Sequence, residues 1–233
     1  KIQGVDTGMG LERLAMVSQG KENIFQTDLF ASIIEILPAD FHERTKRIIA
    51  DHLRAATFLI TDGVEPGKDE RNYITRRLIR RAMTEYYLRA GLDVNFFRNP
   101  VNAVLDIYSK PYPDLKEKRD YTIRVFEQET KDFSERLMKT VPDLKKIYNR
   151  FIAGIDPEKL LPDLIIKDNV VDVNGSVLFR IRETHGVGLE IMRMVMEKWG
   201  LLFSQKTIDA YDVAYKKHQE ISRAGQERKF GGH

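Results

Sequence analysis

The stretch that most limits the fold runs from residue 48 to residue 82 and has the pattern of two helices joined by a sharp turn. In the first helix, apolar side chains recur three or four residues apart, which places them on one face. These residues are Ile49, Leu53, Ala56 and Ile60. Gly63 follows where a left-handed residue commonly ends a helix, and Pro66 stops any continuation. The pattern therefore predicts helix, turn and helix.

The second helix of this pair has two unlike flanks. At about 100° per residue, apolar side chains fall on one flank and four arginines on the other. The apolar residues are Ile74, Leu78, Ile79, Ala82 and Tyr86. The arginines are Arg76, Arg77, Arg80 and Arg81, with no Asp or Glu at the i−4 positions Asn72 and Tyr73. A basic flank is commonly just a solvated face, but the planar fork of arginine suits phosphates. We therefore expect an apolar side that packs and a basic side that stays open to a polyanion.

The composition excludes several classes of site. Lys and Arg number 38 against 35 Asp and Glu, so a polyanion site has to come from local clustering rather than from net charge. The chain has no cysteine, and its histidines lack metal-ligand spacing, so we expect no metal site and no disulfide framework. No run is long enough to span a membrane, and no signal peptide is visible. These features suit a cytoplasmic protein with no membrane partner.

Beyond the helix pair, the pattern stays mainly helical. A charged helix is expected from about residue 115 to residue 139, and Pro142 together with residues 154–157 marks the best boundary. In the lobe that follows, residues 177–183 predict a short helix or strand, and two amphipathic helices come after them. Convincing strands are almost absent, so the predicted class is mainly α.

A glycine-rich turn near the N-terminus is the first candidate for chemistry. Residues 1–20 predict a short strand, this turn and a helix that begins near Leu11. Glycines let a backbone approach a ligand closely, and a helix start attracts anions. Arg13, one turn into that helix, could reach a phosphate, and Asp6 could receive an ammonium group. Taken alone, such a turn is more often structural than functional.

Four segments together resemble the alanyl-tRNA synthetases, a family of class II aminoacyl-tRNA synthetases. VDTGMGLER (residues 5–13) resembles motif 3, and residues 49–82 resemble the tRNA-recognising helical region. FRIRETHG (residues 179–186) resembles the family segment F-x-L-Y-D-T-Y-G. HQEISRAG and KFGGH, near the C-terminus, resemble the junction before the editing domain. The four occur in family order and spacing and cover nearly the whole chain.

The resemblance implies a piece of an alanine–tRNA ligase with a helical tRNA-recognition domain in two lobes. Residues 1–37 would be a strand-turn-helix remnant of the catalytic domain, residues 38–153 the first helical lobe and residues 154–233 the second. ATP and Mg²⁺ would serve the parent enzyme, with neither expected on this piece alone. Because motifs 1 and 2 precede Lys1 in the family, we expect the piece by itself to be inactive.

The resemblance also implies residue roles at the nucleotide site. Arg13 would contact the ATP phosphates, and Asp6 would contact the α-amino group of alanine. Gly8 and Gly10 would leave room for adenine and ribose. These roles agree with the chemistry of the residues, since a carboxylate suits a cation and an arginine suits a polyphosphate.

The resemblance further implies a tRNA partner, bound through its acceptor stem, and the remainder of the synthetase as a second partner. The family reads a G·U wobble pair with an Asn and an Asp, since the shallow minor groove of RNA exposes base edges. Here the Asn position holds Lys68 and the Asp position holds Glu183. The candidate tRNA contacts are Lys68, Asp69, Arg71, Asn72, Arg76, Arg77, Arg80, Arg81, Arg182 and Glu183. The two departures leave open a shifted register, another stem identity, or looser selection compensated elsewhere.

Two alternatives to this function stay open. The chain could be a free-standing, non-catalytic tRNA-binding or helical interaction module derived from the same domain. A motif 2 or a start codon in the gene upstream of Lys1 would distinguish the two. The arginine flank could instead serve only to pack on acidic groups of the absent domains, and arginines paired by salt bridges inside the chain would favour that interpretation.

Overall fold

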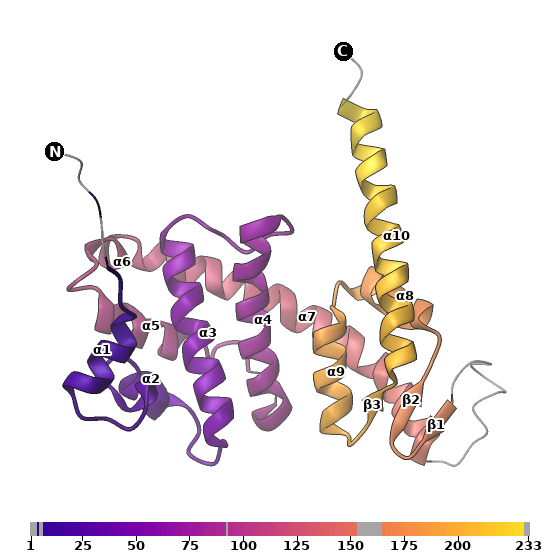
Figure 1. Ribbon diagram of the computed structural model, residues 1–233, viewed down its shortest axis with the longest axis horizontal. Helices are drawn as coiled ribbons and strands as arrows, with labels where there is room; N and C mark the ends of the chain where they lie inside the picture. The colour runs from indigo at the N-terminus through magenta and orange to yellow at the C-terminus, as the bar shows by residue number, and fades with distance from the viewer. Residues whose placement is uncertain (1–3, 5–6, 92, 153–164, 231–233) are drawn as a thin grey trace. The chain divides into compact units, whose positions relative to one another are not determined.

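Two long helices, α3 (Glu43–Thr61) and α4 (Glu70–Ala90), lie side by side and are joined by a short turn, as Figure 1 shows. The predicted stripe of α3 is confirmed, because Ile49, Leu53, Ala56 and Ile60 are all fully buried. Around this pair the fold is mainly α, as predicted.

The computed structural model describes residues 4, 7–91, 93–152 and 165–230. The chain divides into two compact units, residues 1–133 and 134–233, and each is described by itself. The predicted strand near residue 5 falls largely outside the described residues, as does the predicted boundary at residue 154. Between these gaps, the helices carry nearly all the packing.

The first unit is built from helices alone within its described residues. Besides α3 and α4, its helices are α1 (Leu11–Ser18), the 3₁₀ helix η1 (Ile24–Gln26), α2 (Ala31–Ile36), α5 (Arg98–Tyr108), α6 (Pro113–Glu117) and the start of α7 (Arg119–Ile152). Helices α2 and α5 pack on α3 and on each other. The core between them holds large side chains such as Phe30, Leu105 and Tyr108, all almost fully buried.

The turn after α3 ends that helix by backbone geometry. Gly63 has a φ of +84°, in the left-handed region that favours glycine. Its N–H donates to the Ile60 carbonyl at 2.9 Å, and the Val64 N–H donates to the Leu59 carbonyl at 2.8 Å. This pair of bonds is the Schellman arrangement, which satisfies carbonyls at a helix end. The prediction made from Gly63 is confirmed.

The packed face of α4 differs from the predicted one. Ile79, Ala82 and Tyr86 are buried as expected, but Ile74 is 49% exposed. Thr75 and Met83 are buried beside the first three, which places the packed face about one residue away from the predicted flank. The prediction is therefore wrong for Ile74.

Helix α7 also departs from prediction, since it continues through Pro142 to Ile152 instead of ending near residue 139. A proline inside a helix removes one backbone hydrogen bond and disfavours the helix locally. Beyond Pro142, however, Leu144 and Ile147 are buried in the second unit. Their burial offsets the local preference, so the helix persists.

The second unit combines the end of α7 with further helices and a small sheet. Its other elements are β1 (Ile165–Lys167), β2 (Val170–Asp172), α8 (Gly175–His185), α9 (Leu189–Lys198), β3 (Leu202–Phe203) and α10 (Gln205–Phe230). Strand β2 pairs antiparallel with β1, with Ile166 opposite Val171, and parallel with β3. Asn174 begins α8, where its Oδ1 accepts from the Ser176 N–H at 3.0 Å. The segment left open as helix or strand is therefore a helix.

Helices α8 and α10 touch backbone to backbone at Gly175. A Cβ at this position would lie 2.2 Å from the backbone nitrogen of Tyr211 and 2.5 Å from the carbonyl carbon of Ala210. Both distances are far inside van der Waals contact. Only glycine therefore allows this approach, which Figure 1 shows as the crossing of α8 and α10.

We expect Gly175→Ala to lower the unfolding free energy of the second unit by about 1–3 kcal/mol, because the added methyl group forces α8 away from α10. Trp199, the only tryptophan of the chain, lies in this unit, so its fluorescence during urea unfolding measures the effect. Gly188→Ala is the matched control, since the nearest atom to its new Cβ is 3.9 Å away. Equal losses for both variants would contradict the close-approach explanation.

Candidate nucleic-acid interface

Two of the four arginines on the predicted basic flank of α4 contact a buried carboxylate. The Nε of Arg80 donates to Oε1 of Glu129 at 2.7 Å, and the Nε of Arg76 lies 3.5 Å from Oε2. The Glu129 side chain is only 6% exposed, and the guanidinium of Arg80 also covers the Phe133 ring at 5.0 Å. The prediction that this whole flank stays unpacked is therefore wrong for Arg76 and Arg80, because the first half of α7 covers them.

The sequence carried one signal for this cluster. Glu129 stands three residues after Phe126 and four before Phe133, both of which are buried, so it falls in the apolar seam of α7. A carboxylate in such a seam needs a positive partner, because burying an unpaired charge is costly. The arginine pattern within α4 alone could not reveal which other helix covers it.

Other basic groups near the start of α4 remain accessible. Lys68, Arg71 and Arg77 are exposed and are called here the α4 basic surface. Tyr73 is 43% exposed and Ile74 is 49% exposed, and both lie within one turn of Arg77. Of the other candidates in this region, Asp69 is exposed, whereas Asn72 and Arg81 are half-buried. Cations beside exposed apolar and aromatic side chains can bind a ligand that carries both phosphate groups and planar bases.

The turn of residues 65–67 is tied to α4 and α7 by several bonds. The Asn72 Nδ2 donates to the Glu65 carbonyl at 2.8 Å, and the Gly67 N–H donates to the Asn72 carbonyl at 3.0 Å. The Tyr121 hydroxyl donates to the Glu65 carboxylate, which raises the pKa of Tyr121. The side chain of Asn72, a predicted tRNA contact, thus has a partner within the protein.

The glycine-rich turn near the N-terminus leads into α1. Gly8, Gly10 and Arg13 are exposed and lie on this turn and the first turn of α1, whereas Asp6 falls outside the described residues. Gly10 is the N-cap residue of α1. The position of Asp6 relative to Arg13 therefore stays a prediction, while the other three residues share one exposed segment.

An ion pair that the sequence analysis missed ties α1 to α3. The Arg54 guanidinium donates to the Glu12 carboxylate, and its Nη1 lies 3.4 Å from the Tyr108 hydroxyl. A backbone hydrogen bond and then Arg54 lower the pKa of Glu12. The two residues stand 42 positions apart, so no local pattern could have paired them. The pair leaves neighbouring Arg13 on the exposed side.

The candidates in the second unit differ in accessibility. The Arg182 Nη1 donates to the Tyr211 hydroxyl at 3.0 Å, and its guanidinium lies 4.0 Å from the Tyr215 ring centroid. Glu183 is exposed, with its Oε1 3.6 Å from Nε2 of His218. Arg182 thus fastens α8 to α10, whereas the carboxylate of Glu183 reaches solvent.

His185, at the end of α8, also has a partner within the second unit. Its Nε2 lies 2.9 Å from Oδ2 of Asp143 on α7, and the Lys146 ammonium lies 2.7 Å from Oδ1. Lys146 and then His185 lower the pKa of Asp143. This cluster joins α8 to α7.

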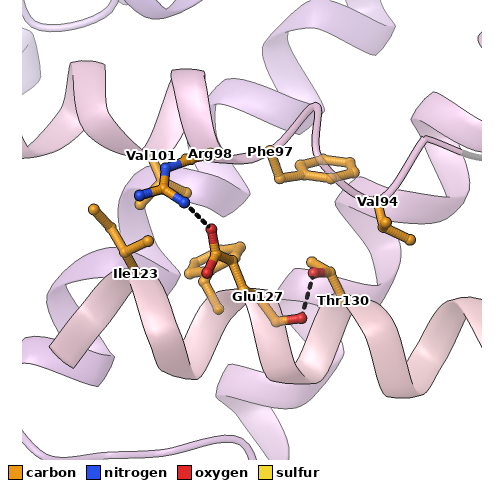
Figure 2. Close-up of a pocket in the computed structure, with 8 residues that line it drawn as sticks. Val94, Phe97, Arg98, Val101, Ile123, Glu127 and Thr130 are labelled. Carbon is orange, nitrogen blue, oxygen red and sulfur yellow. Dashed lines mark hydrogen bonds and ion pairs between the residues drawn. The ribbon is translucent and has the colours of Figure 1, made fainter. Parts of the chain in front are cut away.

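A small apolar pocket between the start of α5 and α7 has no room for a ligand. Figure 2 shows the ion pair across it, in which the Arg98 Nη1 lies 2.8 Å from Oε1 of Glu127. The cavity is about 10 Å³, which is at most the space of one water molecule. Across the described ranges, no group of three or more His, Cys, Asp or Glu side chains could hold a metal ion. In the same ranges, no helix has the length and apolarity needed to cross a membrane.

Comparison with known proteins places these features in a wider context. Residues 2–232 match the family described as tRNA synthetases class II (A). An alanine–tRNA ligase of Halorhodospira halophila is 31% identical, over 98% of this chain and 24% of its own length. Those of Treponema pallidum and Rubrobacter xylanophilus are 30% and 34% identical, over 98% and 96% of this chain and 36% and 24% of their own lengths. The chain thus spans about a quarter to a third of these relatives.

We expect Glu129→Gln to lower the unfolding free energy of the first unit by about 3–5 kcal/mol, because it removes the negative charge that two covered guanidinium groups share. Urea unfolding followed by circular dichroism measures the change. Glu127→Gln is the matched control, two residues away on the same helix. Its pair with Arg98 is solvent-exposed, so we expect a loss of about 0–1 kcal/mol. Similar small losses for both would show that the Glu129 cluster adds little to stability.

Proposed function

The chain belongs to the class II (A) tRNA synthetase family, and we propose that it binds the acceptor stem of a tRNA through the α4 basic surface. Its matched relatives are named alanine–tRNA ligases, so the tRNA we propose is the one that carries alanine. The proposed role is to hold the substrate RNA during an aminoacylation carried out by a longer protein.

The observation that carries this proposal is the exposure of Lys68, Arg71 and Arg77 together with Tyr73. Arginine forks and lysine ammonium groups grip phosphates, and these contacts position an RNA duplex without reading its sequence. Arg76 and Arg80 are left out of the proposed contact set, because Glu129 already occupies them. The proposed electrostatic contact is therefore smaller than the arginine pattern of α4 suggested.

For the N-terminal segment we propose a part in nucleotide binding. Arg13 would contact the phosphates of ATP. The backbone at Gly8 and Gly10 would lie close to the nucleoside, since both glycines are exposed near Arg13 in the chain. Asp6 keeps its proposed role toward the alanine amino group. Bound Mg²⁺ would neutralise phosphate charge. We assign no magnesium ligand to this chain.

We propose that ligase activity belongs to the longer protein. In that protein, alanine would first be activated as an adenylate and then transferred to the 3′ end of the tRNA. The chain described here would contribute Arg13 to the first step and the α4 basic surface to the second. By itself, we expect it to bind RNA and not to charge it.

We expect Arg77→Gln to weaken binding of an acceptor-stem hairpin to a similar degree for every stem sequence, because a phosphate contact carries no base information. Fluorescence anisotropy at salt concentrations from about 50 to 200 mM should show the slope of log affinity against log salt falling by about 1. Lys116→Gln, an exposed lysine on α6, is the control and should leave affinity and slope unchanged. Binding that ignores salt, or no binding at low salt, would overturn the proposed function.

We expect Glu183→Ala to change the preference between stems with and without a G·U wobble pair by about tenfold, because an accessible carboxylate can accept hydrogen bonds from base edges. Competition binding with the two hairpins measures the ratio of affinities. Glu197→Ala, on α9, is the control, since this exposed carboxylate pairs weakly with Arg193 at 3.9 Å. If Glu183→Ala weakens both stems equally, Glu183 does not read bases.

A further inference from the structure

Several side chains converge on the turn of residues 65–67, directly before Lys68 and Asp69. The Asn72 side chain donates to the backbone carbonyl of Glu65, and the Tyr121 hydroxyl donates to the Glu65 carboxylate. Arg76 adds a third tether, because its Nη2 lies 3.4 Å from the Pro66 carbonyl oxygen. Asn72 and Arg76 thus act on backbone carbonyls of this short turn, and Tyr121 acts on the side chain of its first residue.

Arg76 links this turn to the buried carboxylate of α7. Its Nε lies 3.5 Å from Glu129 while its Nη2 approaches Pro66, so one guanidinium spans both groups. The Arg76 side chain is 23% exposed, and its planar guanidinium lies between the two partners. Through Arg76 the turn is therefore connected to α7 as well as to α4.

Close packing adds to these tethers at Gly67. A Cβ on this residue would lie 2.6 Å from the Cβ of Asn72, so the turn rests directly on the first helical residues of α4. Its backbone N–H is also bonded to the Asn72 carbonyl. A segment held by bonds on its amide, carbonyl and side-chain groups has little freedom to move, although it lies at the surface.

We propose that Asn72, Arg76 and Tyr121 are positioning residues for tRNA binding, which hold the turn so that Lys68 and Asp69 are presented to the acceptor stem in one fixed arrangement. This inference rests on the proposed function. It assigns Asn72 and Arg76 an indirect role in place of the direct tRNA contact that the family resemblance implied. Asn72 and Arg76 each donate to a carbonyl oxygen of the turn, whereas Lys68 and Asp69 are exposed.

A double-mutant cycle separates the indirect role from direct contact. Arg76→Lys keeps a positive charge near Glu129, but an ammonium cannot span both Glu129 and Pro66. We expect Arg76→Lys to weaken hairpin binding threefold or more, and to cause no further loss in a chain that already carries Lys68→Gln. Equal losses in both backgrounds would show that Arg76 touches the RNA itself and would overturn the inference.

Hydrogen exchange of the free protein tests the tethers without RNA. We expect Asn72→Ala and Arg76→Lys to speed amide exchange in residues 64–69, measured by mass spectrometry, because the bond from the Gly67 N–H is loosened. Arg77→Lys, which changes an exposed neighbour outside the tethers, should leave this exchange unchanged. An unaltered rate in the first two variants overturns the inference alone. Failure of the wild-type chain to bind the hairpin overturns the proposed function instead.

Discussion

The arrangement of the first unit depends on one buried carboxylate. Glu129 is paired with two guanidinium groups one helical turn apart on α4, and this pairing offsets the cost of taking its charge out of water. Because Arg76 and Arg80 are both held, α4 cannot turn about its axis without breaking a contact to α7. The pairing of Arg76 and Arg80 with Glu129 therefore decides which residues of α4 face solvent. Arg77 is the main example, although it takes no part in that pairing.

Features written into local sequence were predictable. The buried stripe of α3 follows from spacing alone, and the end of that helix follows from the conformational freedom of Gly63. The open face of α4 was not predictable in this way, because α4 is covered on two sides and periodicity marks only one. At Pro142, local preference lost to burial of Leu144 and Ile147. The small sheet was not predicted, because its strands have only two or three residues and show no clear alternation.

The predicted tRNA contacts also fall into a part that the sequence could indicate and a part that it could not. Family resemblance selected positions along the chain, and the structure sorts them by whether a neighbouring element already engages their side chains. Those engaged within the protein are Asn72, Arg76, Arg80 and Arg182. Those exposed to solvent are Lys68, Asp69, Arg71, Arg77 and Glu183. Because Glu129 and Tyr211, the partners of the three arginines, are many positions distant in the chain, only the tertiary structure could separate these arginines from the exposed candidates.

The turn before α4 shows what kind of constraint a single backbone angle imposes. Gly63 has a positive φ, yet nothing lies within 4 Å of the place where its Cβ would stand. Space is therefore no obstacle to a side chain there, and the obstacle is handedness. A mirror-image alanine would suit the site and would also restrict the unfolded chain, whereas an ordinary alanine would be strained. What this corner of the molecule specifies is a chirality and not a size.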